Sequence, residues 1–272
     1  MLQDATIFVK KLTVGENMIF TIDIGNSNIN VDAVDGGVSV FHCRISSSRY
    51  RTGDEYAVLL KNISEQHGFD LNRVTGAIIS SVVPKLTSVL KYAVKLCTGC
   101  DALVMAPGVK TGLNIRIDDP GEMGSDIVAA AVGAITRYPL PCVLIHIATA
   151  TSIGVIDKNG CYIGGLICPG HILGQVALEK GASRLPSVSL DAPKKVIGRS
   201  TGECIRSGIV YGAAAMLDGL IDRIADELGE APTVVATGET GEDIVTNCRS
   251  EIIFDKELKM RGLLNIFEKN KK

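Results

Sequence analysis

A short loop of small and polar residues near the N-terminus has the composition of a phosphate-binding turn. It follows an apolar strand predicted over residues 18–24 and consists of Gly25, Asn26 and Ser27, with Asp23 at the strand's end. Backbone N–H groups in such turns can point together at one anion. A carboxylate beside phosphates can hold Mg²⁺ through water, and we favour this interpretation of Asp23. The alternative is a turn aspartate that caps nearby backbone amides.

A second loop of the same kind lies 123 residues further on, in the segment VLIHIATAT. At that offset Asp23 aligns with His146, and the loop residues 25–28 align with 148–151. Both segments have an apolar strand, a tight loop, a second strand and a glycine turn. A repeat of this length indicates a duplicated domain, although two hairpins can also resemble each other by chance. Two such loops facing each other across a cleft would hold one polyphosphate from both sides.

Each loop belongs to a β-meander that is followed by helices and further strands. Strands are expected at residues 18–24, 28–35, 38–45, 74–80 and 102–105, with helices at 54–67 and 84–96. The second half has strands at 142–147, 151–157, 161–167 and 233–236. Helices are expected from Asp119, from Ser200 to about Leu228, and at 258–267. The fold class is therefore α/β, divided into residues 18–118 and 119–272, with residues 1–17 as an N-terminal extension.

The composition favours a soluble cytoplasmic protein. The 272 residues carry a formal net charge of −2 without a basic block, which argues against nucleic-acid and membrane-surface partners. No apolar run approaches the ~20 residues needed to span a bilayer. The eight cysteines are scattered mostly through apolar strands, as reduced structural thiols are.

Several segments, taken in order, resemble the type III pantothenate kinases of the acetate and sugar kinase/actin superfamily. They are DIGNSN at 23–28, SSVVP at 80–84, GVKTGL at 108–113, DPGEMGSD at 119–126, GGLICPG at 164–170, IGRSTGECIRSGIVYG at 197–212 and VVATGE at 234–239. The resemblance implies two ribonuclease H-like domains with a cleft between them, and a homodimer. It also implies ATP-dependent phosphorylation of pantothenate to 4′-phosphopantothenate, the first step of coenzyme A biosynthesis.

The same resemblance implies roles for particular residues. Asp126 matches the general base that takes the proton from the attacking hydroxyl, a role that suits phosphoryl transfer. The alternative is a carboxylate placed there only because the start of a helix favours negative charge. ATP is expected to bind Asp23, Gly25, Asn26, Ser27, Thr149, Thr151, Thr237 and Gly238. Pantothenate is expected to bind Lys110, Thr111, Gly112, Gly124 and Thr201. Mg²⁺ is expected at Asp23, and K⁺ or NH₄⁺ at the His146 position.

Five positions depart from the family pattern. Ile117 stands in place of a tyrosine, Ile127 of an arginine, His146 of an aspartate, and Ala148 and Glu239 of glycines. An arginine–carboxylate contact contributes about 1.5–3 kcal/mol, which isoleucine cannot supply. An imidazole cannot replace a carboxylate around K⁺. Alanine is harmless unless the loop needs a glycine-only conformation, and Glu239 would bring a like charge near the nucleotide unless it points away.

Three functions remain as hypotheses. The first is a working pantothenate kinase. The alternative is a catalytically impaired paralogue that binds a nucleotide or metabolite and acts as a regulatory protein. The third is a kinase for another small hydroxylated substrate, with Ile117 and Ile127 forming a more apolar pocket. A zinc ligand role for His146 is disfavoured, since no other His or Cys is spaced to join it.

Overall fold

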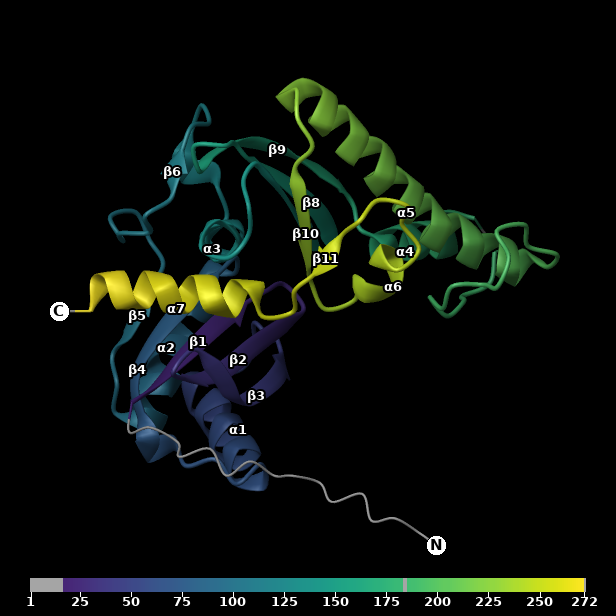
Figure 1. Ribbon diagram of the computed structural model, residues 1–272. Coiled ribbons are helices and arrows are strands. Elements are labelled where there is room, and N and C mark those ends of the chain that lie inside the picture. The colour runs from purple at the N-terminus through teal and green to yellow at the C-terminus, as the bar shows by residue number, and fades with distance from the viewer. Residues whose placement is uncertain (1–16, 183–184, 272) are drawn as a thin grey trace, which may run out of the picture.

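The computed structural model describes residues 17–182 and 185–271, which form two β-sheets with helices packed on them (Figure 1). The first sheet has the order β3-β2-β1-β4-β5. Its strands are β1 (Met18–Ile24), β2 (Asn28–Asp35), β3 (Val38–Ser46), β4 (Val74–Ser81) and β5 (Ala102–Val104). Helices α1 (Gly53–Gln66) and α2 (Pro84–Thr98) bury their apolar sides against one face, next to the short 3-10 helix Leu71–Arg73.

The second sheet repeats the plan of the first and adds one strand. Its order is β11-β10-β7-β8-β9-β6. The strands are β6 (Asn114–Ile115), β7 (Cys142–Ile147), β8 (Ala150–Ile156), β9 (Cys161–Pro169), β10 (Thr233–Thr237) and β11 (Ile253–Phe254). In the first sheet β1 is antiparallel to β2 and parallel to β4. In the second sheet β7 is likewise antiparallel to β8 and parallel to β10. The order β9-β8-β7-β10-β11 matches β3-β2-β1-β4-β5, which confirms the duplication.

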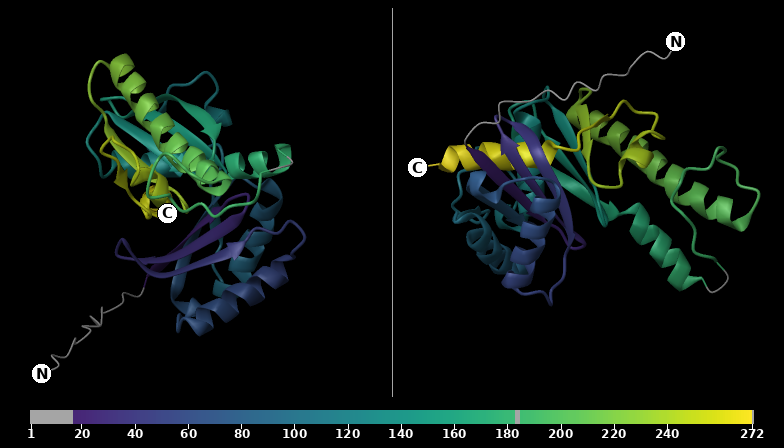
Figure 2. Two further views of the ribbon diagram at one scale, coloured as in Figure 1. Left: turned by 90° about the vertical axis from the view of Figure 1, so that its right-hand side faces the viewer. Right: turned by 90° about the horizontal axis from the view of Figure 1, so that it is seen from below.

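Two helices lie between the sheets, α3 (Ser125–Ile135) and α7 (Leu258–Asn270) (Figures 1 and 2). They approach each other so closely that glycine is needed at the contact. A Cβ on Gly262 would lie 1.7 Å from the carbonyl oxygen of Ala129, and a Cβ on Gly133 would lie 2.2 Å from that of Leu258. The first residues of both helices lie beside the ends of β1 and β4, where Lys259 pairs with Asp23 and Ser125 binds Ser81.

The remaining helices belong to the second half. The long α5 (Thr201–Leu228) packs on the face of the second sheet opposite α3, next to α4 (His171–Gly181) and α6 (Glu242–Val245). By length and composition α5 is the one described helix apolar enough to cross a membrane. Its apolar side chains Val210, Ala214 and Leu217 are buried against the sheet, as in the core helix of a globular protein.

The predicted strands and long helices are all present, and their ends are shifted by up to three residues except at the start of the helix predicted from Asp119. The helix predicted from Asp119 is wrong in its start. Asp119 caps only a 3-10 turn, Pro120–Glu122, by accepting from the N–H of Gly121 at 2.8 Å, and α3 begins at Ser125. The strands β6 and β11 and the helices α4 and α6 were not predicted. A division between residues 118 and 119 stays a prediction, because β6 pairs with β9 while α7 packs on the first sheet. Apart from Asn17, the predicted N-terminal extension lies outside the described residues.

Candidate active site

The two predicted loops face each other across a cleft. A hollow of about 260 Å³ is lined by Gly25, Asn26 and Ser27 from one loop and by Ala148 and Thr149 from the other. Asp23, Asp126 and His146 also line this hollow. The structure therefore brings together both loops, the expected metal-binding Asp23 and the expected general base Asp126.

Asp23 and His146 occupy equivalent positions near the ends of β1 and β7. Asp23 lies beside Ser80 of β4, and His146 lies beside Thr237 of β10. Both side chains are buried at the floor of the cleft. No described residue other than glycine has a positive φ, so Ala148 is unstrained and its departure from glycine is harmless to the loop.

Asp126 is the second residue of α3, and its helix start is tied to the first sheet. The Ser125 hydroxyl accepts from the N–H of Ser81 at 3.0 Å and donates to the carbonyl oxygen of Ser81 at 3.1 Å. Burial raises the pKa of Asp126 above its ordinary value, and the nearby Asp23 carboxylate raises it further. A base with a raised pKa is a better proton acceptor near neutral pH.

His146 lies next to Asp126, with 3.5 Å between its Nδ1 and Oδ2 of the carboxylate. Burial and the positive charge of Lys259 lower the pKa of His146 to about 4. The imidazole is therefore neutral at pH 7, and a neutral nitrogen ligand does not suit a hard monovalent cation. The residues at this position do not fit the K⁺ or NH₄⁺ that the resemblance implies.

Lys259, which we did not predict as a site residue, forms an ion pair with Asp23 through its Nζ and Oδ2. Burial alone would lower the pKa of Lys259, but Asp23, Asp126 and Glu239 outweigh burial and raise it. The ammonium is therefore charged, and the carboxylate expected to hold Mg²⁺ through water is already paired. Within residues 17–182 and 185–271, no group of three or more His, Cys, Asp or Glu side chains could hold a metal ion. Mg²⁺ in nucleotide sites is usually held by only one or two carboxylates together with the phosphates, so the ion pair with Lys259, and not the number of ligands, is what disfavours a Mg²⁺ held by Asp23.

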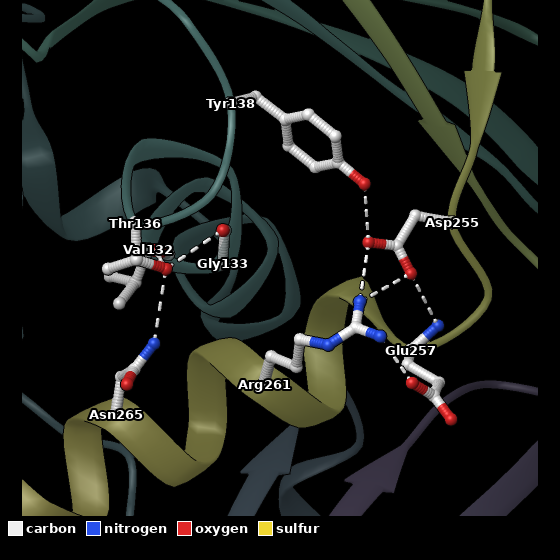
Figure 3. A network of polar contacts seen from close by, with 8 residues as sticks. All are labelled: Val132, Gly133, Thr136, Tyr138, Asp255, Glu257, Arg261 and Asn265. Carbon is white, nitrogen blue, oxygen red and sulfur yellow. Dashed lines mark hydrogen bonds and ion pairs between the residues drawn. The ribbon is translucent and has the colours of Figure 1, made fainter. Parts of the chain in front are cut away.

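The helix that carries Lys259 is anchored by a network of polar contacts (Figure 3). Arg261 donates to both carboxylate oxygens of Asp255, at 2.8 and 2.6 Å, and Tyr138 donates to Asp255 at 2.8 Å. One turn further along, Asn265 donates to the hydroxyl of Thr136 at 3.2 Å. These contacts join α7 to β11 and to the end of α3, and so fix the base of the lysine side chain.

Glu239 links the two halves of the molecule across the cleft. It follows β10, and its carboxylate accepts from the side-chain amides of Asn28 at 2.7 Å and Asn30 at 2.8 Å, both on β2. Arg44 on β3 adds a longer contact at 3.4 Å. Glu239 thus points toward the opposite sheet, where amides and a guanidinium compensate its charge.

Glu239 and Lys259 lie where two neighbouring hollows of the cleft meet. Both residues line the 260 Å³ hollow and a neighbouring one of about 410 Å³, which extends past Thr21, Asp32, His42 and Gly238. Ligand sites usually measure about 300–1,000 Å³, so the smaller hollow alone is tight for a nucleotide.

The other predicted site residues are spread more widely. Thr151 is buried on β8, Thr237 is buried at the end of β10, and Gly238 follows with φ 138° and lines the larger hollow. Gly124 immediately precedes α3. The predicted substrate segment Lys110, Thr111 and Gly112 and the predicted contact Thr201 do not line the cleft.

The 110–112 segment lies at the far end of α7. The Lys110 N–H donates to the Asn270 side chain at 3.1 Å, and Lys269 donates to the Thr111 carbonyl oxygen at 3.2 Å. Asn270 lies eleven residues further along α7 than Lys259, a distance of about 16 Å along the helix axis. Ile117 and Ile127 both pack against the apolar cluster between α3 and the second sheet.

Comparison with known proteins agrees with this arrangement. A model of the type III pantothenate kinase family matches residues 19–223. Proteins named type III pantothenate kinase from Brevibacillus brevis and Exiguobacterium sp. are each 38% identical, over 93% and 94% of this chain and 99% and 100% of their own lengths. The one from Moorella thermoacetica is 36% identical over 93% of this chain and its whole length. The chain belongs to the type III pantothenate kinase family.

Solved structures with the same fold are more distant in sequence. A Campylobacter jejuni protein named for the Baf family of transcriptional activators aligns with a TM-score of 0.56 at 22% identity, over 92% of this chain and 98% of its own. The (R)-2-hydroxyglutaryl-CoA dehydratase component A of Acidaminococcus fermentans aligns with a TM-score of 0.54 at 13% identity, over 94% and 99%. The chain has the duplicated α/β fold of the acetate and sugar kinase/actin superfamily.

Proposed function

We propose that this family member phosphorylates pantothenate with ATP and so takes the first step of coenzyme A biosynthesis. The observation that carries the proposal is the position of Asp126. Its carboxylate, with a raised pKa, lines the cleft between two loops that both suit phosphates. The relatives named type III pantothenate kinase, matched over nearly the whole chain, support the substrate assignment.

Each residue set has a chemical task in this reaction. Asp126 accepts the proton of the substrate hydroxyl as its oxygen attacks the γ-phosphorus of ATP, and ADP leaves with the electrons of the broken P–O bond. Backbone N–H groups of the loops around Gly25 and Ala148 bind phosphate oxygens from the two sides. Mg²⁺ is expected as a companion of ATP from solution, because the residues around Asp23 do not fit a metal held by the protein.

We also propose a homodimer in the cytoplasm, built from domains 18–118 and 119–272. Apolar side chains are exposed along β9, α4 and the segment before α5, and a second copy of the chain would bury them. They are Ile163, Ile167, Ile172, Leu173, Leu178, Val196 and Ile197.

The test is a direct phosphorylation assay. The protein is incubated with ATP, Mg²⁺ and pantothenate, with and without K⁺ or NH₄⁺, and 4′-phosphopantothenate is detected by mass spectrometry. Asp126→Asn serves as the matched inactive variant. Product formation by the wild type and its loss in Asp126→Asn support the proposal. No product at high protein concentration, beside an active family member, would refute it.

A second candidate is a family member that binds ATP or a metabolite without turnover. The departures from the family pattern favour it, because a neutral His146 does not suit a monovalent cation and Ile127 packs into an apolar cluster where the family has an arginine. Calorimetric titration separates the two candidates, since binding of ATP without any phosphorylated product would point to the second.

A further inference from the structure

We propose that the ammonium of Lys259 provides the positive charge beside the nucleotide phosphates. It does so next to Asp23, at the position where a metal ion would otherwise be bound. The proposal rests on the proposed function in one respect, since it concerns the counter-charge for ATP. It goes beyond that function by assigning a binding residue and a metal-independent mode of nucleotide binding.

The geometry places the ammonium at the centre of the acidic groups. Lys259 is ion-paired with Asp23, and its charge acts on Asp126 and Glu239 as well. Its side chain is 17% exposed, so the charge is directed into the cleft rather than toward bulk solvent. Among the described residues that line the 260 Å³ hollow, only Lys259 and Arg44 are cationic, and Arg44 is 57% exposed and contacts Glu239.

The lysine is held there by the packing of its helix. Gly262 lets α7 approach Ala129 of α3, Asn265 binds Thr136 at the end of the same helix, and Arg261 binds Asp255 (Figure 3). The Cα of Lys259 therefore lies at a fixed distance from Asp23 near the end of β1 and from Asp126 at the start of α3. Only the flexible stem remains free to adjust the ammonium to a ligand.

The chemistry of an ammonium suits this role. Lysine has three N–H donors, so one can remain on Asp23 while the other two bind phosphate oxygens. Lysine serves as a point charge for phosphate in other nucleotide sites. A divalent ion at Asp23 would have to displace Lys259 and leave a buried ammonium without its partner, which is strongly unfavourable. Lysine and a protein-held metal ion at Asp23 therefore exclude each other.

Three measurable consequences follow. First, the affinity of the wild type for ATP should change by less than about threefold when Mg²⁺ is replaced by EDTA. Second, Lys259→Met should weaken metal-free ATP binding by about ten- to a hundredfold, the usual value of a charge-assisted contact. With the ammonium gone, Asp23 and Asp126 should become able to bind Mn²⁺.

The experiment uses the full chain in two titrations. Isothermal titration calorimetry measures ATP binding in EDTA and in excess Mg²⁺, and electron paramagnetic resonance measures Mn²⁺ binding without nucleotide. Lys95→Met is the control, because Lys95 lies on α2 and forms an exposed ion pair with Asp101. It should bind ATP and Mn²⁺ as the wild type does.

The outcomes separate this proposal from the proposed function. Loss of ATP binding in EDTA, or Mn²⁺ that binds the wild type and is lost in Asp23→Asn, would overturn the role of Lys259. If the wild type binds no ATP in either buffer, the proposed function fails, and the Mn²⁺ titration still tests whether Lys259 excludes a metal. If circular dichroism shows Lys259→Met to be unfolded, the two wild-type titrations and Asp23→Asn decide the question alone.

Discussion

The contacts of Glu239 predict that this residue limits the affinity of the cleft for ATP. We expect Glu239→Ala to bind ATP more tightly than the wild type. Removing the carboxylate breaks its hydrogen bonds with Asn28 and Asn30 and joins the two hollows into one larger cleft. It also removes a negative charge near the expected phosphates.

The expected size of the effect follows from these contacts. A hydrogen bond to a charged group contributes about 1.5–3 kcal/mol when well shielded from water. The Glu239 side chain is 33% exposed, so solvent screening reduces the two amide contacts together to roughly 2 kcal/mol. A ligand that must first open the cleft loses affinity by the fraction of molecules that are open. Two kcal/mol corresponds to about 30-fold, so we expect a gain of about 10- to 30-fold in Glu239→Ala.

Calorimetric titration with ATP measures this gain directly, and hydrogen exchange of the β2 amides reports whether the cleft opens. Glu242→Ala is the matched control, because Glu242 lies three residues away on α6 and pairs with Lys256 at the surface. An unchanged ATP affinity in Glu239→Ala would refute the reasoning. An equal gain in Glu242→Ala would show that loss of negative charge, and not release of the bridge, is the cause.

The remaining predictions concern the base, the histidine and one glycine. Asp126→Asn should lower turnover by about 10²–10⁴ with little change in ATP affinity, as measured by steady-state kinetics and calorimetry. The pKa of His146 is lowered to about 4 in the folded chain. The free energy of unfolding should therefore fall by at most about 3 kcal/mol as the pH is lowered from 6.5 toward 4, because the unfolded chain binds a proton that the folded chain does not. Urea unfolding of His146→Asn should lack this fall. Gly238→Ala should lower the urea midpoint, because φ is 138° and the new Cβ would lie 2.0 Å from the Ile147 carbonyl oxygen. A midpoint equal to that of the wild type would contradict this last expectation.

The fold was predictable because its elements have strong local signals. The two meanders alternate apolar and polar residues, and their similarity at a fixed offset predicted the duplication that the sheet orders confirm. The short strands β6 and β11 carry no such signal, since two residues hold no periodicity and only their neighbours in the sheet define them. The Asp119 cap was a true local signal that ended in a single 3-10 turn, because Met123 and Gly124 leave the helical path before Ser125.

The cleft was predictable only in part. Asp23, Asp126 and His146 were identified from loops and motifs, but Lys259 was missed although its spacing offered a clue. Lys259, Leu263 and Ile266 share one face of α7, so a charged residue stands on an otherwise apolar stripe. What that face contacts depends on α7 returning from the end of the chain to the first sheet, which no local pattern specifies. The Glu239 contacts depend likewise on how the two halves approach each other.

The departures at the cleft make electrostatic sense as a set. A neutral His146 at the end of β7 removes one of the negative charges that would call for a small cation, and Lys259 neutralises the other strand-end acid, Asp23. Asp126 is left as the carboxylate without a direct cationic partner, which suits a proton acceptor. Restoring an aspartate at 146 alone would add a buried charge that Lys259, already committed to Asp23, cannot also neutralise. The two positions are therefore coupled, and only a change at both would restore a site that depends on bound cations.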